Sequence, residues 1–193
     1  MTRLEQLKER VRSLYAAKHE GRADWADWLY EHHVMVTADY AAQLARRYEA
    51  NEELATAAAL LHDVADAVMK REAPGHEEKS WETARALLTE TGFNDTEIKI
   101  VVDDAIRFHS CHDGERPQTL EGKIVATADA LSHLKTDFYR RAFQEMSKTK
   151  SPNAVTEWIC SKIERDFHEK ILFDEVREET RPDYEKLKAS FLK

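Results

Sequence analysis

Glycine, proline and cysteine are all scarce in this chain of 193 residues. Five glycines and four prolines are too few for the many tight turns of a β-sandwich or a β-barrel. The two cysteines, Cys111 and Cys160, lie far apart and belong to no Cys-x-x-Cys or Cys-His cluster, so the sequence contains no thiol-based metal or redox motif. These absences favour a protein built from helices.

Long apolar runs and excess positive charge are also missing. No apolar run approaches the roughly 20 residues of a membrane-spanning helix. The net charge of −8 argues against a nucleic-acid polymer as the partner, because phosphate backbones require a basic surface. A small anionic ligand needs only local positive charge and stays open. The first twelve residues are charged and show no signal-peptide pattern, so we expect a cytoplasmic protein that binds neither membranes nor nucleic acid.

What is present is helical periodicity along nearly the whole chain. We predict helices over residues 2–20, 25–48, 51–70, 77–91, 94–110 and 119–146, followed by two more. Asn51 is a predicted N-cap, Asn94 opens a capping box, and Ser151-Pro152 restarts a helix. The expected fold is a single all-α bundle. It divides into an N-terminal helix (residues 1–22), a main domain (23–146) and a charged C-terminal helical extension (147–193), which is typical of a surface or homodimer-forming element.

Several polar residues fall on faces of these helices that are otherwise apolar. They are His33, His62, Asp63, His76, His109 and Asp129. A single histidine on such a face is more often a hydrogen-bonded core residue than a metal ligand. Burial of six polar residues from several helices is costly, however, unless they meet in space.

A metal ion is the simplest partner for this set. The sequence offers few inward-facing lysines or arginines that could compensate a buried carboxylate, whereas a metal ion does so well. Neutral imidazoles and carboxylates, with no competing thiolate, suit borderline divalent metals. We therefore interpret His62 and Asp63 as adjacent ligands, completed by His33 before them and Asp129 far after them.

Three motifs carry a family resemblance. The segments "EHHVMVTADYAAQLA", "AALLHDVADA" and "LEGKIVATADAL" together resemble the HD-domain superfamily of metal-dependent phosphohydrolases. The resemblance covers roughly residues 25–139 and implies an all-α HD-domain bundle. Two further segments, "GHEEKSWETARALL" and "AIRFHS", resemble motifs of the members that bind two ions, and they add His76 and His109 to the implied ligands. The implied cofactor is one or two divalent ions, such as iron or manganese.

The resemblance also implies a reaction, the hydrolysis of a phosphate ester or anhydride of a nucleotide or other small phosphorylated metabolite. A metal-activated water would attack the phosphorus, and activity should fall below about pH 6, where ligand histidines protonate. Asp63 is the implied shared ligand, and Asp66 and His112 are candidate catalytic or proton-transfer groups. The stringent-response hydrolases of the superfamily carry Glu-Asp where this chain has Asp66-Ala67, which disfavours their substrate. The candidate substrate contacts are Lys79, Arg107, His133, Lys135 and Arg140.

Two other functions remain open from the sequence. Some members of the wider superfamily use a similar cage of histidine and aspartate for a di-iron centre that activates oxygen, and the ligand preferences of these metals overlap. A non-catalytic module that binds a nucleotide or metal and signals to a partner is the second alternative, although such modules usually lack ligands that this chain retains.

Overall fold

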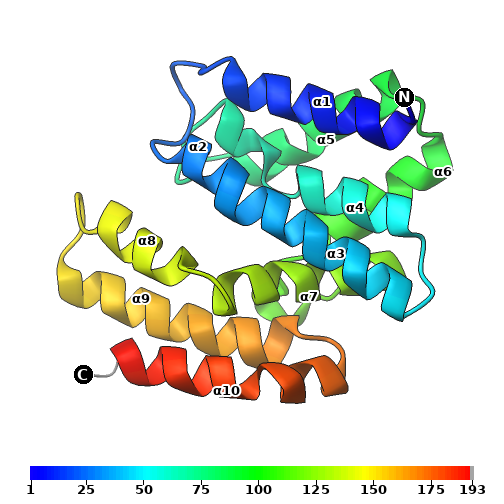
Figure 1. Ribbon diagram of the computed structural model, residues 1–193. Coiled ribbons are helices and arrows are strands. Elements are labelled where there is room, and N and C mark those ends of the chain that lie inside the picture. Colours follow the sequence, from blue (N-terminus) through cyan, green and yellow to red (C-terminus); the bar gives the residue numbers. More distant parts are fainter. Residues whose placement is uncertain (192–193) are drawn as a thin grey trace.

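The protein is a stack of helices, and the computed structural model describes residues 1–191, with no strand in that range (Figure 1). The α-helices are α1 (Arg3–Ala16), α2 (Ala26–Leu29), α3 (Met35–Arg47), α4 (Glu52–Leu61), α5 (His76–Glu90), α6 (Asp95–Ile98), α7 (Leu120–Leu134), α8 (Phe138–Met146), α9 (Pro152–Arg165) and α10 (Asp174–Phe191). The π-helical turns are Tyr30–Val34, Lys99–Ile106 and Asp166–Lys170, and the 3-10 turns are Val64–Ala67 and His112–Gly114. The predicted all-α fold class is confirmed.

The helix starts follow local capping chemistry. The Asn51 side chain accepts a hydrogen bond from the Leu54 backbone at the start of α4. Asn94 forms a complete capping box with Glu97, and Ser151 caps α9 with Pro152 in its first turn. Each of these caps satisfies backbone N–H groups that a helix leaves without an internal partner, and all three predicted helix starts are confirmed.

The core is centred on α3, α4 and α7. Every residue of α4 from Leu54 to Leu61 is buried, and so is every residue of α7 from Ile124 to Leu134. A helix buried on all sides is surrounded by other elements, and Figure 1 shows α7 between α3 and α4 on one side and the C-terminal helices on the other. Any polar side chain of α7 between Ile124 and Leu134 therefore points into the interior of the protein.

Three predicted helices are shorter than expected. The helix predicted over residues 2–20 ends at Ala16. The helix predicted over 51–70 ends at Leu61, because the backbone leaves the helical conformation at Asp63 (φ −119°, ψ 28°). The helix predicted over 119–146 is interrupted between Leu134 and Phe138, where the Thr136 hydroxyl donates to the carbonyl of Ser132 and accepts from the backbone of Phe138. Periodicity alone did not reveal either break, since apolar residues continue on both sides.

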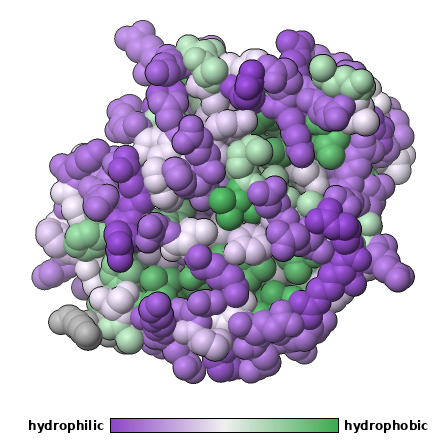
Figure 2. Space-filling model, viewed as in Figure 1, coloured by the Kyte–Doolittle hydropathy of each residue, from purple (hydrophilic) through white to green (hydrophobic). Residues whose placement is uncertain are grey.

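The C-terminal segment packs directly on the main domain. Helices α9 and α10 lie side by side below α7 and α8 (Figure 1). Val155, Ile159, Ile163 and Phe167 form a fully buried stripe along α9 and the turn that follows it. The outer face seen in Figure 2 is mostly hydrophilic, with hydrophobic residues visible chiefly in a band across its lower half. No helix within residues 1–191 has the length and apolarity needed to cross a membrane.

Candidate metal centre

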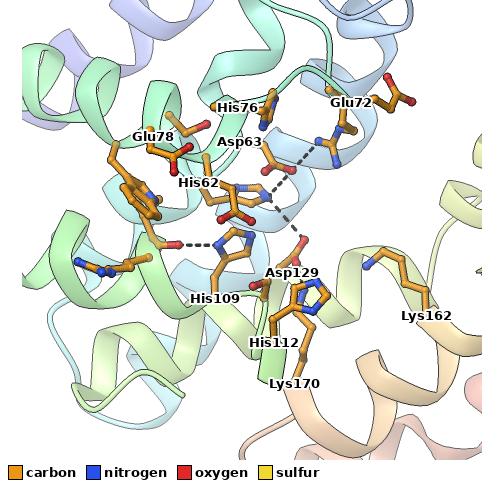
Figure 3. A pocket seen from close by; sticks show the side chains of 18 of the residues that line it. His62, Asp63, Glu72, His76, Glu78, His109, His112, Asp129, Lys162 and Lys170 are labelled. Atoms are coloured by element: carbon orange, nitrogen blue, oxygen red, sulfur yellow. Dashed lines mark hydrogen bonds and ion pairs between the residues drawn. The ribbon is translucent and has the colours of Figure 1, made fainter. Parts of the chain in front are cut away.

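The break at the end of α4 turns His62 and Asp63 toward the same point. On a regular helix, neighbouring side chains diverge by about 100° and do not face each other. Here His62 closes α4 and Asp63 begins a new turn, so both side chains line one pocket (Figure 3). His33 comes from the π-helical turn Tyr30–Val34, and Asp129 comes from the middle of α7.

These four side chains form a tight cluster. The Nε2 atoms of His33 and His62 are 3.0 Å apart, and Oδ1 of Asp129 lies 3.4 Å from the first and 3.6 Å from the second. Oδ2 of Asp63 lies 3.7 Å from Nε2 of His33 and 3.5 Å from Nε2 of His62. The two histidines are fully buried and Asp129 nearly so. The structure thus brings together side chains separated by up to 96 residues.

The hydrogen bonds behind the histidine rings determine which nitrogen faces the cluster without a proton. Nδ1 of His62 lies 2.8 Å from the carbonyl oxygen of Ala59, which can only accept, so Nδ1 carries the proton. The hydroxyl of Ser132 donates to the carbonyl of Asp129 at 2.8 Å, so its oxygen accepts from Nδ1 of His33 at 2.9 Å. In their neutral forms both histidines therefore present bare Nε2 lone pairs to each other.

This arrangement fits a divalent metal ion. Two bare nitrogens face Oδ1 of Asp129, which is buried and has no hydrogen-bond partner within the described residues. A single proton on Nε2 of His62 can form a good hydrogen bond with only one of the other two acceptors, whereas a cation at the centre contacts all three. Ligands held about 2.0–2.2 Å from one ion lie about 3.0–3.6 Å from each other, which matches the observed spacing of 3.0–3.6 Å. Nδ1–H groups held from behind are also typical of histidine ligands.

A second group of possible ligands shares His62. Atoms of His62, Asp63 and His109 lie within 4.8 Å of one another. Nδ1 of His109 is 2.6 Å from the carbonyl of Ile106, so its Nε2 is bare as well. His76 lies in the same pocket, but its Nε2 is 2.9 Å from Oδ1 of Asp66 and it belongs to neither group. Five of the six predicted ligands thus gather around two adjoining positions, and the sixth contacts Asp66.

Burial and the nearby carboxylates act against each other on the histidines. Burial lowers the pKa of His33 and lowers that of His109 to about 4. Burial also acts to lower the pKa of His62, but Asp63 and Asp129 outweigh it and raise this pKa. The neutral imidazole that a metal ligand must present is therefore favoured at His33 and His109.

The expectation that few lysines or arginines face inward is wrong. Arg71 donates to Oδ2 of Asp63 at 2.5 Å and pairs with the fully buried Asp66. Lys170 is 2 % exposed and forms an ion pair with Oδ2 of Asp129. Burial acts to raise the pKa of both Asp63 and Asp129, but these cations and the neighbouring imidazoles outweigh it and hold both values well below the usual range. Cations of the chain itself therefore already compensate the carboxylates.

His133 and Asp166 extend the cluster toward the C-terminal segment. Nε2 of His133 lies 3.3 Å from Oδ1 of Asp129, and Nδ1 lies 2.9 Å from Oδ2 of Asp166. The His133 ring stacks on that of His33 with centroids 4.8 Å apart. Lys162 and Tyr139 also bond Asp166. Burial lowers the pKa of Lys162 to about 8 and that of His133 to about 3.

The other predicted site residues divide into two groups. His112, Arg107 and His133 line the pocket, with His112 exposed at its rim. Asp66 does not line it, but is fully buried and bonds Arg71 and His76, which do. Lys79, Lys135 and Arg140 do not line it. Lys79 pairs with Glu82 on the outside of α5, and Lys135 and Arg140 pair with Asp183 and Asp137 around a different surface hollow. The structure gives the substrate contacts predicted for these three residues no support.

Sequence reasoning missed several residues outside the recognised motifs that line the pocket or hold the histidines near it. Those that line the pocket are Arg71, Trp158, Lys162, Arg165 and Lys170. Ser132 and Asp166 do not line it, but bond Nδ1 of His33 and Nδ1 of His133. A signal existed for part of this set, because Lys162, Asp166 and Lys170 each follow a member of the buried α9 stripe by three residues. A position three residues on lies on the same side of a helix.

Comparison with known families agrees with this geometry. The family described as HD domain matches residues 30–134, a range that contains His33, His62, Asp63, His109 and Asp129 and covers more than half of the chain. No curated protein and no solved structure matches the chain. The helices after residue 134 that supply Lys162, Arg165 and Lys170 lie outside the matched range.

Proposed function

The chain belongs to the HD-domain family, and on this premise we propose that it is a metal-dependent hydrolase that cleaves a phosphate ester or anhydride. Its substrate would be a nucleotide or another small phosphorylated metabolite. The observation that carries the proposal is the convergence of His33, His62 and Asp129, three acceptors that face one another without a proton donor of their own. Such a centre at the base of a pocket is suited to metal-assisted hydrolysis.

The charge of the pocket supports a phosphorylated substrate. The pocket has a volume of about 520 Å³, which suits a small molecule. Five lysine or arginine side chains and five carboxylates line it, so its formal charge is balanced although the whole chain carries −8. A divalent ion in the cluster adds two positive charges and gives the pocket a net attraction for a phosphate dianion.

His33, His62 and Asp129 would hold the ion, with Asp63 and His109 beside them. A bound divalent ion supplies an activated water with a lowered pKa and polarises the phosphoryl oxygens. Lys170 keeps Asp129 ionised and fixes its Oδ2, which leaves Oδ1 directed at the two imidazoles. These contacts preserve the position of the donor atoms, as oriented ligands require.

Other residues of the chain shape the surroundings of the reacting phosphate. Arg71 bridges Asp63 and Asp66 on one side of the pocket, so it holds Asp63 in its ionised form next to the cluster. Lys162 extends from α9 to within 3.3 Å of Nδ1 of His133. It can thus place a positive charge beside the cluster, where the charge of a phosphoryl group increases during hydrolysis.

The direct test is phosphate release from a panel of phosphomonoesters and phosphoanhydrides, with Mn²⁺, Fe²⁺ or Zn²⁺ added to chelator-treated protein. We expect metal-dependent release that Asp129→Asn reduces by at least about 100-fold, because the amide lacks the charge of the ligand. Asp103→Asn, an exposed carboxylate paired with Arg85, is the matched control and should keep full activity. Iron-dependent oxygen uptake without phosphate release, or the absence of metal binding, would overturn the proposal.

A further inference from the structure

One face of α9 forms a wall of the pocket. Trp158, Lys162 and Arg165 follow one another at intervals of four and three residues and all line the pocket. Positions with this spacing share one side of a helix. This wall lies outside the residues that match the family, so the family match assigns it no role. Trp158 is 40 % exposed although it is a large apolar residue.

Arg165 is unusual among the arginines of this protein. Of the fifteen arginines in the chain, twelve form an ion pair with a carboxylate within residues 1–191. In that range only Arg107, Arg116 and Arg165 do not. Two of these three, Arg107 and Arg165, line the pocket. In a chain with 37 acidic residues, an arginine without a carboxylate is expected where a ligand supplies the negative charge.

The contacts of Arg165 leave its charge uncompensated. Its NH1 group lies 3.0 and 3.2 Å from the two ring nitrogens of His112, and its Nε is buried without a hydrogen-bond partner in the described part of the chain. Burial, together with the charge of Arg165, lowers the pKa of His112. A neutral imidazole can accept a hydrogen bond from the guanidinium, but it contributes no negative charge.

The two walls of the pocket have opposite charge. Glu72, Glu77 and Glu78 line the side formed by α5 and the loop before it, whereas Lys162 and Lys170 reach in from the opposite side (Figure 3). Lys170 and Lys162 lie next to the cluster, since they contact Asp129 and His133. Arg165 lies further out, against the exposed His112.

We infer that the α9 wall is a second anion-binding subsite, in which Arg165 binds a phosphate or carboxylate group of the substrate other than the phosphoryl group at the cluster. This inference rests on the proposed function, because the cluster defines the first subsite. It narrows the substrate to metabolites with two anionic groups, one at each end of the pocket. A guanidinium is well suited to this task because it binds an oxyanion through two parallel hydrogen bonds.

The test compares ligands that carry one or two anionic groups. Isothermal titration calorimetry of the Mn²⁺-loaded protein would measure the affinity of methylphosphonate, which carries one anionic group. The ligands with two anionic groups are bisphosphonates, with one to four methylene groups between the phosphorus atoms, and the matching phosphonocarboxylates. At one spacer length we expect binding about 10- to 100-fold tighter than that of methylphosphonate, as a charge-assisted bidentate contact allows. The phosphonocarboxylates distinguish a phosphate-binding from a carboxylate-binding subsite.

Variants assign that gain to Arg165. Arg165→Gln should remove most of the advantage of the two-anion ligand over methylphosphonate, and Arg165→Lys should restore part of it. Arg116→Gln removes an arginine that also lacks a carboxylate partner but lies outside the pocket, and it should leave the ratio unchanged. If methylphosphonate binds but no spacer improves the affinity, or if Arg165→Gln keeps the full advantage, this inference fails while the proposed function stands. If methylphosphonate does not bind at all and no phosphate ester is cleaved, the proposed function itself fails.

Discussion

Ser132 offers a sharp test of how the cluster is prepared for a metal. Its hydroxyl is fully buried, donates to the carbonyl of Asp129 and accepts from Nδ1–H of His33. Ser132→Ala removes the only acceptor that this Nδ1 has in the described structure. The imidazole can then move its proton to Nε2 and donate to Oδ1 of Asp129, which lies 3.4 Å away. In that tautomer Nε2 of His33, the nitrogen that faces the cluster, carries a hydrogen and has no lone pair for a metal.

The substitution should change both the metal affinity and the free energy of unfolding. Loss of a supporting hydrogen bond behind a metal ligand typically costs 10- to 100-fold in metal affinity, and we expect that range for Mn²⁺ or Zn²⁺. Loss of one buried hydrogen bond costs about 1–2 kcal/mol in folding free energy. For a domain of this size that corresponds to a fall of roughly 2–8 °C in Tm, so the variant should remain folded.

The measurement is a competition titration of each metal against a chelating dye, together with thermal unfolding of the same samples. Thr180→Val is the matched control, because Thr180 is a fully buried residue whose hydroxyl donates to a backbone carbonyl at 2.8 Å, on α10 and away from the cluster. Both variants should lose similar stability, but only Ser132→Ala should lose metal affinity. A Ser132→Ala protein whose metal affinity stays within about twofold of the wild type would refute the tautomer argument.

Three further predictions concern the metal, the pH and the packing. Removal of the metal by a chelator should abolish phosphate release and lower the Tm by roughly 5–10 °C, because an ion present at about 100 times its Kd stabilises the fold by about 2.7 kcal/mol. A Tm that does not change when the metal is added back would contradict this prediction. Burial lowers the pKa of Lys162 to about 8 from an unfolded value of 10.5. Between these two values the unfolded chain binds more protons than the folded one, so the free energy of unfolding should rise with pH from about 8 to 10, by up to about 3 kcal/mol. In urea unfolding Lys162→Met should show a smaller rise of this free energy with pH, and an identical rise would argue against a buried ammonium. A Cβ on Gly122 would lie 2.6 Å from both Oδ2 of Asp104 and Cβ of Pro117, so Gly122→Ala should lower the free energy of unfolding by about 1–3 kcal/mol. Lys123→Ala, on the exposed face of α7, should leave this free energy unchanged in the same urea unfolding assay.

The sequence was sufficient for the fold class and for the core of the cluster. Capping residues and 3.6-residue periodicity depend on neighbours in the chain, and the helix starts at Asn51, Asn94 and Ser151 follow from them. The inward positions of His33, His62 and Asp129 were also predictable, because each is set among apolar residues of a helix. These are local properties, and no knowledge of distant contacts was needed to find them.

What the sequence could not show depends on contacts between distant segments. The end of α4 at Leu61 is not marked by glycine or proline, and the turn that follows is held from other elements: the Tyr15 hydroxyl donates to the carbonyl of Asp63, and the Ala65 backbone donates to the Ser80 hydroxyl. The pairing of Lys170 with Asp129 spans 41 residues of sequence. A lysine in a strongly charged segment is most often exposed, and only tertiary packing identifies this one as an interior residue.

The inward-facing Arg71 and Lys170, which the sequence analysis did not expect, change what the metal is needed for. If no cation faced Asp63 and Asp129, folding would leave two ionised carboxylates buried, and the ion would be required to form the site. Arg71 and Lys170 already provide that compensation, so the fold does not depend on the ion for charge balance. What remains uncompensated is smaller and local, namely the two bare Nε2 atoms and Oδ1 of Asp129. The metal-free protein should therefore stay folded with its ligands in place, and an ion should bind to a site that is already formed.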